Sequence, residues 1–440
     1  MPADPSQPSA FDAHNPPSQE LIADCVHCGF CLPTCPTYRL WGEEMDSPRG
    51  RIHLMQAGLE RSPLTDRMVG HFDACLGCMA CVTACPSGVQ YDRLLEQTRA
   101  QVERNHQRSR AEKVLRTMIF NLFPYPGRLR KLRGPLRVSQ RLRLDRAVRR
   151  TGVLDRLLPG LAAMERLTPT LGAAEELPDV VPAAGEQRAA VAMLTGCVQN
   201  VFFSEVNAAT ARVLAAEGCR VVIPSGQGCC GALSSHSGRE PEAQRFAAET
   251  IATLDLDGVD AVVTNAAGCG SAMKDYGALF APENDQTATD SAAVFAGRVR
   301  DLSELLVELG PVAERHPLSL KIAYHDACHL GHAQGVRDQP RQLLRAIPGV
   351  ELVEIADAAL CCGSAGVYNI LQPQAAAELG DAKARAIAAT GADLIVTANP
   401  GCLMQIAVAL ERRGTPMPMA HTAVVLDASI RGLPAESLLG

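Results

Sequence analysis

The sequence lacks the features that would place it across a membrane, on a secretory route or in a nucleotide-binding class. No apolar run approaches the roughly eighteen residues of a membrane-spanning helix. Residues 1–20 are rich in Pro, Ser, Asp and Asn without the basic start and apolar core of a secretory signal, which predicts a disordered tail. Gly226, Gly228 and Gly231 have the Gly-x-Gly-x-x-Gly spacing, but the segment carries the vicinal Cys229 and Cys230, and we expect no dinucleotide site there. We therefore expect a cytoplasmic protein without its own dinucleotide site.

Charge is also sparse overall but unevenly distributed. The net charge of −6 implies no nucleic-acid partner, although residues 99–150 are strongly basic. That stretch lacks the interleaved aromatics of a single-strand binder. Residues 118–123 add an apolar face beside the cations. This face could dock an acidic partner subunit, rest on anionic lipid at the cytoplasmic side of the inner membrane, or pack on its own domain.

Cysteine, in contrast, is abundant, with seventeen residues that fall into patterns. Without an export signal, clustered thiols indicate metal binding rather than disulfides, and the odd number argues against complete pairing. Residues 25–36 and 75–86 both read Cys-x-x-Cys-x-x-Cys-x-x-x-Cys-Pro. This is the ligand run of bacterial ferredoxins in duplicate, and it predicts two [4Fe-4S] clusters.

The spacing also predicts which thiols share a cluster. In a two-cluster ferredoxin the fourth cysteine of each run ligates the other cluster, and the proline after it keeps it out of a helix interior. The expected ligands of one cluster are Cys25, Cys28, Cys31 and Cys85, and those of its partner are Cys75, Cys78, Cys81 and Cys35.

The segment Ser47-Pro48-Arg49-Gly50-Arg51 lies between the two runs. Ser47 suits an N-cap and Pro48 suits the first helical position, so a helix is predicted to begin here. Arg49 and Arg51 would then lie near the clusters. Two interpretations stay open: their charge raises the cluster potentials, or they are solvated residues of a first helical turn.

A second duplication is also built from cysteines. Eight further cysteines form two sets that match at offsets of 131 to 133 residues, which indicates a duplicated domain. Cys219 falls outside the pattern. The first set is Cys197, Cys229, Cys230 and Cys269, and the second is Cys328, Cys361, Cys362 and Cys402.

Short apolar segments alternate with helical ones from residue 188 onward, which predicts parallel α/β sheets. Strands are expected at residues 190–194, 220–223, 261–264, 320–324, 351–355 and 393–397, and helices at 204–216, 341–346 and 375–389. The fold class is a multidomain α+β and α/β chain. Its expected parts are the tail 1–20, a helical two-cluster ferredoxin-type module 21–98, a basic helical connector and linker 99–187, and duplicated Cys-Cys-Gly domains 188–315 and 316–440.

Each Cys-Cys-Gly repeat puts its cysteines just after parallel strands, whose carboxyl ends meet at one crevice. Four thiols per repeat could therefore bind one or two further metal centres, iron-sulfur first and zinc second. The alternative is unliganded cysteines that act as small hydrophobes. Two adjacent cysteines cannot both bind one iron without strain, so an unusual cluster, or one thiol left free for redox chemistry, is also a possible interpretation. Among the nearby histidines His236, His325, His329 and His332, we single out His329 as a ligand, a donor behind the ligands or a proton relay.

With both duplications in view, the chain resembles the iron-sulfur subunit of glycolate oxidase from about residue 24 to the C-terminus. The likeness rests on the two cysteine runs and on residues 47–51, 324–330 and 361–366. The Cys-Cys-Gly half is also similar to heterodisulfide reductase, glycerol-3-phosphate dehydrogenase and lactate-utilisation subunits. The wider superfamily carries a fifth cysteine where this chain has Ala272 and Gln405, which favours an ordinary cluster or a vestigial site over a non-cubane double cluster.

The resemblance implies a division of labour. A separate FAD-containing subunit would oxidise glycolate to glyoxylate, and this chain, with no catalytic residue of its own, would pass the electrons to a quinone or another acceptor. The alternatives are the same role in a lactate-utilisation or glycerol-3-phosphate dehydrogenase complex, or a thiol-disulfide enzyme like heterodisulfide reductase. A cluster-based sensor that binds nucleic acid is a third hypothesis.

Overall fold

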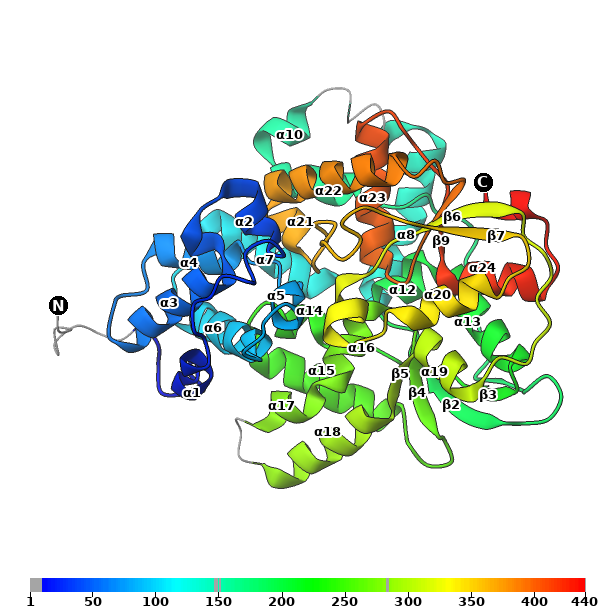
Figure 1. Ribbon diagram of the computed structural model, residues 1–440, viewed down its shortest axis with the longest axis horizontal. Helices are drawn as coiled ribbons and strands as arrows, with labels where there is room; N and C mark the ends of the chain where they lie inside the picture. Colours follow the sequence, from blue (N-terminus) through cyan, green and yellow to red (C-terminus); the bar gives the residue numbers. More distant parts are fainter. Residues whose placement is uncertain (1–9, 146–148, 150–151, 282–284, 440) are drawn as a thin grey trace.

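The computed structural model describes residues 10–145, 149, 152–281 and 285–439. The N-terminal helices form one end of the molecule, and two β-sheets with their covering helices form the other (Figure 1). A helical connector runs between them. Among the described residues, no helix combines the length and apolar character needed to cross a bilayer.

The N-terminal module is helical, as expected. Ser47 accepts a hydrogen bond from the backbone N–H of Gly50 at 3.0 Å, so it caps the helix predicted to begin there. Met55, Phe72, Leu94 and Leu95 fill its core. Its helices are α1 Gln19–Ala23, α2 Pro36–Trp41, α3 Pro48–Leu59, α4 Asp66–Asp73, α5 Ala80–Thr83 and α6 Tyr91–Asn105, with a 3-10 turn at Glu44–Asp46.

The expected disordered tail is wrong for residues 10–20, whereas residues 1–9 lie outside the described part. Ala10 and Phe11 are buried. The Phe11 ring fits against Gly58 of α3, where a Cβ would come within 2.6 Å of the ring. Asp12 accepts hydrogen bonds from Arg104 at 2.9 Å and from Gln101 at 3.0 Å. Contacts with α3 and α6 therefore fix the segment.

The basic connector packs its apolar face on its own chain. Ile119 and Phe120 are buried and join Val367 and Ile370 of the second Cys-Cys-Gly domain in one hydrophobic cluster. Of the three interpretations of this face, packing within the chain is the one observed. Residues 146–148 and 150–151 lie outside the described part. The helices are α7 Arg110–Leu122, α8 Pro126–Arg141, α10 Val153–Leu157 and α11 Pro159–Arg166.

The two sheets have matching strand orders, which supports the duplication. The first is ordered β1-β3-β2-β4-β5 and the second β7-β6-β8-β9. All neighbours are parallel except β1, which adds an antiparallel edge from the segment expected as a linker. The strands are β1 Val180–Val181, β2 Ala189–Met193, β3 Cys219–Val222, β4 Ala261–Thr264, β5 Val299–Asp301, β6 Leu320–Tyr324, β7 Val350–Glu354, β8 Leu394–Thr397 and β9 Met419–His421.

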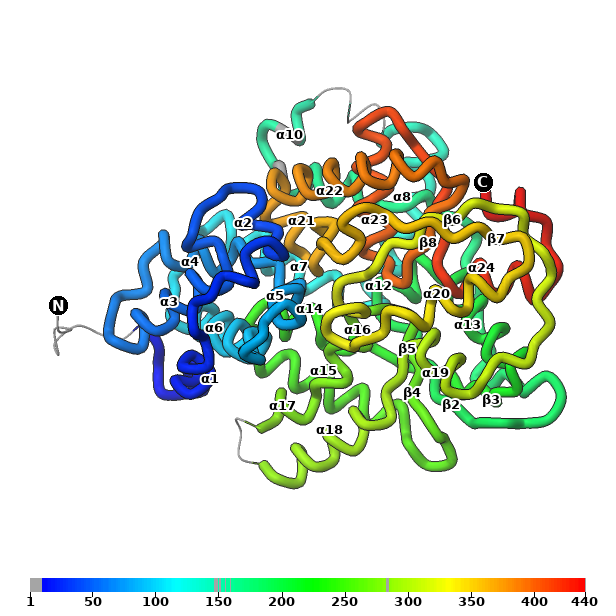
Figure 2. The backbone as a smooth tube through the Cα atoms, viewed as in Figure 1, coloured from blue at the N-terminus to red at the C-terminus, as the bar shows by residue number. Residues whose placement is uncertain are grey.

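Helices cover the sheets and join them into one body. Every residue of β2 is buried, as in parallel sheets covered on both faces. Residues of both sheets share one hydrophobic core, and α24 of the second domain packs on α13 of the first, as the tube in Figure 2 traces. The first domain contains α12 Val198–Phe202, α13 Ser204–Ala216, α14 Ala232–Ser235, α15 Glu240–Thr253, α16 Ala267–Lys274, α17 Tyr276–Phe280, α18 Gln286–Arg298 and α19 Leu302–Leu309. The second contains a π-type turn at His329–Ala333, α20 Asp338–Arg345, α21 Tyr368–Leu371, α22 Pro373–Ala388, α23 Pro400–Arg412, α24 Thr422–Ile430 and a 3-10 turn at Ala435–Leu438.

Candidate metal centres

The two ferredoxin-type loops have left-handed residues at the same two positions. His27 and Gly77, each two residues after the first cysteine of its run, have φ of 53° and 64°. Gly29 and Met79, each four residues after that cysteine, have φ of 85° and 61°. Left-handed conformations cost energy for residues with a Cβ, so their recurrence at matching positions indicates loops shaped for a purpose.

The structure brings together one predicted ligand set. Cys75, Cys78 and Cys81 line a single cavity with Cys35 of the other run, as the exchange of fourth cysteines requires. All four are buried. Burial raises the pKa of the Cys78 and Cys81 thiols well above their ordinary value. Buried thiols facing one cavity are suitable ligands for a [4Fe-4S] cluster, because bound iron would neutralise the negative thiolate charge that burial disfavours.

Positive charge lies beside this thiol set. Burial alone would raise the pKa of Cys75, but the charges of Arg51 and Arg99 outweigh it and lower the pKa. Arg51 is only 1% exposed, and its guanidinium donates to the hydroxyl of Thr37 and to the carboxylate of Asp46, each at 3.2 Å. The interpretation of Arg51 as a solvated first-turn residue is therefore wrong.

Each loop is also held by an arginine that donates to its backbone. Arg49 donates to the carbonyl of His27 at 3.0 Å and pairs with Glu44 at 2.6 Å. Arg99, which sequence reasoning did not single out, donates to the carbonyl of Cys75 at 2.6 Å. Glycine is needed at residue 50 because the start of α3 packs closely on the turn at Glu44, where a Cβ would come within 2.0 Å of the Glu44 carbonyl oxygen.

The other predicted set, Cys25, Cys28, Cys31 and Cys85, lies closer to solvent. Cys25, Cys31 and Cys85 pack on the core of the module, and Cys28 is exposed. Burial raises the pKa of Cys31. The loop therefore presents one edge of this set to the surface.

The Cys-Cys-Gly repeats gather their thiols as the strand pattern predicted. The Sγ atoms of Cys197 and Cys229 are 3.7 Å apart, and those of Cys328 and Cys361 are 3.9 Å apart. The neighbouring Cys229 and Cys269 lower the pKa of Cys230 well below its usual range. Cys361 and Cys402 have the same effect on Cys362. Cys219 lies apart in β3, fully buried, as its exclusion from the pattern implied.

The glycine of each Cys-Cys-Gly has a structural reason. Gly231 and Gly363 have φ of 82° and 91°. A Cβ would approach the carbonyl oxygen of Ala243 in α15 to 2.9 Å at the first glycine, and that of Ala376 in α22 to 2.8 Å at the second. Because glycine has no Cβ, each Cys-Cys-Gly turn can pack directly on its helix, which places its two cysteines beside the other thiols of the repeat.

The fifth-cysteine position of the wider superfamily is otherwise engaged in the second repeat. Gln405 is buried, accepts a hydrogen bond from Asn369 at 3.2 Å and donates to the carbonyl of Ala376 at 2.8 Å. With both ends of its amide bonded, Gln405 is not a spare donor for a metal.

A line of histidines joins the N-terminal module to both repeats. His236 lies 3.5 Å from the carboxylate of Glu96, and its ring is 4.9 Å from that of His329. The Nδ1 of His329 is 3.5 Å from the Sγ of Cys328. Sequence reasoning identified the histidines but not Glu96, whose proximity depends on how α6 docks.

The N-terminal module meets the second repeat at the thiols themselves. Cys78 and Cys328 belong to one buried cluster with Leu76. The Oγ1 of Thr83 hydrogen-bonds the Nδ1 of His332 at 2.7 Å nearby. The buried four-thiol set and the second repeat are therefore neighbours.

Comparison with known proteins finds family models that match successive parts of the chain. The 4Fe-4S dicluster domain matches residues 21–89, and the cysteine-rich domain matches residues 191–274 and 322–407. The linker region of glycolate oxidase iron-sulfur subunits matches residues 111–168. The probable glycolate oxidase iron-sulfur subunit of Bacillus subtilis is 40% identical over 89% of this chain and 90% of its own length. The chain belongs to the glycolate oxidase iron-sulfur subunit family.

Other relatives fit less completely or at lower identity. The glycolate oxidase iron-sulfur subunit of Escherichia coli is 34% identical over 89% of this chain and 91% of its own length. Lactate utilization protein A of an Exiguobacterium strain is 29% identical over 55% of this chain, although that covers 98% of the shorter protein.

Family membership settles the general role. As a member of the glycolate oxidase iron-sulfur subunit family, the chain is an electron-transfer subunit of an oxidoreductase complex, and its dicluster domain binds [4Fe-4S] clusters. The predicted duplication and the α/β class of the C-terminal half are confirmed.

Proposed function

We propose that this chain receives electrons from an FAD-containing subunit that oxidises glycolate to glyoxylate and passes them toward a quinone-type acceptor. One cluster is held by Cys25, Cys28, Cys31 and Cys85, and the other by Cys35, Cys75, Cys78 and Cys81. When bound, each [4Fe-4S] cluster supplies a one-electron redox centre. The residues of the chain hold the two centres, set their electrostatic surroundings and determine which surfaces they face.

The observation that carries the proposal is the position of the buried thiol set. It lies between the partly buried outer set, of which only Cys28 is exposed, and the thiols of the second repeat, since Cys75 and Cys81 share a core with the outer set and Cys78 shares a buried cluster with Cys328. Arg51 and Arg99 bring positive charge to Cys75. A reduced cluster carries one more negative charge, so these arginines favour electron uptake at the inner position.

The exposed loop has the surface that a donor subunit needs. Val26 and Phe30, which flank Cys28, are 68% and 66% exposed. Large apolar side chains beside an exposed ligand suit a protein partner whose docking excludes water there. We therefore propose that the FAD-containing subunit docks over Val26, Cys28 and Phe30.

Helix α8 supports a peripheral contact with the membrane that holds a quinone. Leu132, Val138 and Leu142 are exposed on or next to this helix, among several arginines. Basic helices with exposed apolar residues bind anionic lipid surfaces. Sedimentation with vesicles tests this contact. We expect binding to anionic but not to zwitterionic vesicles, and binding to neither, or equal binding to both, would contradict the contact.

Glycolate is preferred over lactate as the substrate of the complex because the glycolate relatives align over nine-tenths of both chains, including the connector. The lactate-utilisation relatives match only about half of this chain. Co-expression with candidate FAD-containing subunits, followed by glycolate- and lactate-dependent dye reduction, separates the two alternatives.

Paired cysteine variants test the ligand assignment. If the fourth cysteines are exchanged, Cys35→Ala should lose the same cluster as Cys78→Ala, and Cys85→Ala the same cluster as Cys28→Ala. EPR spectra and redox titrations of the reduced, anaerobically purified variants give the readout. Cys219→Ala, buried but outside every thiol set, is the control that keeps all iron. A match between Cys35→Ala and Cys28→Ala would show that each run ligates its own cluster and would refute the assignment.

A further inference from the structure

His325 lies directly after β6 and is buried without any hydrogen bond to its ring. The side chain is 1% exposed, and neither Nδ1 nor Nε2 has a partner. Buried polar atoms are nearly always hydrogen-bonded, and an imidazole with both nitrogens unsatisfied is costly. In contrast, the buried His421 uses both nitrogens, toward the carbonyl of Asn265 and the backbone N–H of Ala423. The Cys362 thiol is the polar group that interacts with the ring of His325, and neither ring nitrogen has a hydrogen bond of ordinary geometry.

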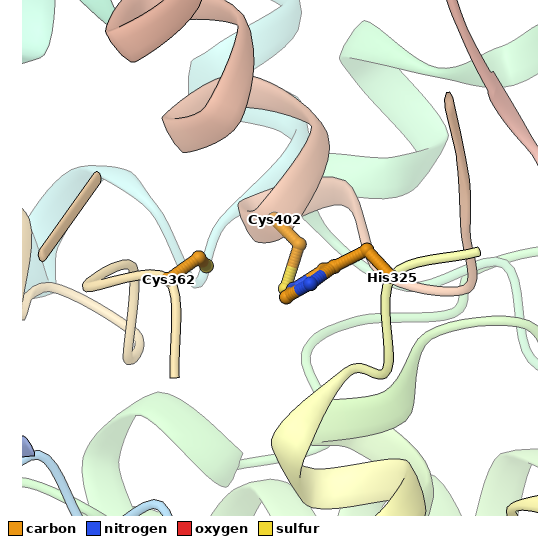
Figure 3. A group of neighbouring side chains, drawn as sticks. All are labelled: His325, Cys362 and Cys402. Atoms are coloured by element: carbon orange, nitrogen blue, oxygen red, sulfur yellow. The ribbon is translucent and has the colours of Figure 1, made fainter. Parts of the chain in front are cut away.

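Two thiols face this ring. The ligand atoms of His325, Cys362 and Cys402 all lie within 4.8 Å of one another. Figure 3 shows the three side chains converging from the loop after β6, the Cys-Cys-Gly turn and the first turn of α23. A tetrahedral ion lies about 2.0–2.3 Å from imidazole nitrogen and thiolate sulfur, which puts its ligand atoms about 3.3–3.8 Å apart. Small side-chain rotations would bring these three atoms to that spacing.

The first repeat has no such group at the equivalent position. The N–H of Leu194 bonds the carbonyl of Val263, and the N–H of His325 bonds that of Val396, so Leu194 is its structural counterpart. The repeats differ again at Lys383, a buried amine that donates to the carbonyl of Asp357 at 2.7 Å. Lys383 stands where the first repeat has Thr250. At these two equivalent positions the second repeat has an imidazole and a buried amine, where the first repeat has Leu194 and Thr250.

We propose that His325, Cys362 and Cys402 are ligands of a metal centre with mixed imidazole and thiolate donors that only the second repeat forms. Two thiolates and one imidazole suit a borderline-soft ion, zinc or iron. Cys361, adjacent in sequence, and Cys328, 3.9 Å from it, are the nearest further thiols. The buried ammonium of Lys383 offsets part of the negative charge that the thiolates bring. The two repeats are therefore chemically unequal despite their common fold.

Metal analysis of the anaerobically purified full chain tests the proposal. Iron and zinc per chain are counted in the wild type and in His325→Leu, which copies the residue of the first repeat, His325→Cys and His316→Leu. His316 is exposed in the same domain and is the control. We expect His325→Leu to lose a whole equivalent of iron or zinc per chain, whereas His325→Cys and His316→Leu keep it. Unchanged metal content in a folded His325→Leu protein would overturn the proposal.

A measurement on the wild type keeps the test independent of how the variants fold. If the metal is zinc, X-ray absorption at the zinc edge should show nitrogen near 2.0–2.1 Å and sulfur near 2.3 Å. If it is iron, pulsed EPR of protein labelled with ¹⁵N-histidine should show a directly bonded nitrogen. Sulfur-only ligation in either arm would refute the role of His325. The iron of the dicluster domain is counted separately, so failure here leaves the proposed electron-transfer function intact.

Discussion

Replacing Arg51 by glutamine should lower the reduction potential of the cluster that we propose is held by Cys35, Cys75, Cys78 and Cys81. Arg51 is fully buried and lines the same cavity as these thiols. Of the two arginines near Cys75, it makes the larger electrostatic contribution to lowering the pKa of that thiol. Glutamine keeps hydrogen-bonding capacity for Thr37 but removes the charge. The reduced cluster is the more negative state, so it loses more stabilisation than the oxidised cluster.

The size of the effect follows from Coulomb's law. Side chains that line one small cavity are separated by about 6–8 Å, and at an effective dielectric constant of about 20 two unit charges at that range interact by about 2–3 kcal/mol. For one electron, a tenfold change in equilibrium constant is about 59 mV. The expected fall is therefore about 90–130 mV. Asp46 would lose its Arg51 partner at 3.2 Å but keep its contact with His71 at 3.0 Å.

The assay is a redox titration followed by EPR, with Arg51→Lys as the matched variant. Lysine keeps the charge but lacks the planar fork that bonds Thr37 and Asp46 together. We expect less than half of the glutamine shift. Two results would refute the reasoning: a shift below about 20 mV in an Arg51→Gln protein that retains both clusters, or an equal shift in both variants, which would point to lost geometry rather than lost charge.

Three further predictions follow from the structure. Gly238→Ala should destabilise the chain more than Gly226→Ala, by at least about 2 kcal/mol in thermal melts. Both glycines have left-handed φ, but a Cβ at Gly238 would lie 2.1 Å from the carbonyl oxygen of residue 99 in α6, whereas a Cβ at Gly226 would meet nothing. An equal loss of stability in the two variants would contradict the clash. Phe30→Asp should slow electron transfer from the proposed FAD-containing subunit about tenfold or more, since burying a Phe contributes about 1.5–3 kcal/mol. The iron content should stay unchanged, and Val312→Asp, at a similarly exposed site elsewhere, should have no effect. Burial lowers the pKa of His421 to about 4, so the unfolded chain binds a proton first as pH falls. Stability should drop by up to about 3 kcal/mol between about pH 6.5 and 4, and His421→Gln should melt with a flatter pH dependence in that window.

The pattern of the sequence was enough to predict most of the fold. Strand β4 Ala261–Thr264, strand β6 Leu320–Tyr324 and helix α13 Ser204–Ala216 lie where periodicity placed them, because buried parallel strands are short apolar runs with clear ends. The strands β1, β5 and β9 were missed because each has only two or three residues and pairs at a sheet edge. The segment around Phe11 was expected to be disordered because its partners lie in helices far along the chain.

Ligand spacing was readable from the sequence because a cluster must be wrapped by a short loop, and a short loop leaves a fixed cysteine pattern. The two cysteine runs and the duplicated Cys-Cys-Gly sets therefore predicted the candidate metal-binding thiols and identified the family without coordinates. Tertiary structure decided what surrounds those thiols. Arg99 beside Cys75, Cys78 against Cys328, and the unsatisfied ring of His325 beside Cys362 all join residues distant in sequence. Such contacts depend on how helices and sheets dock, and no local pattern encodes that.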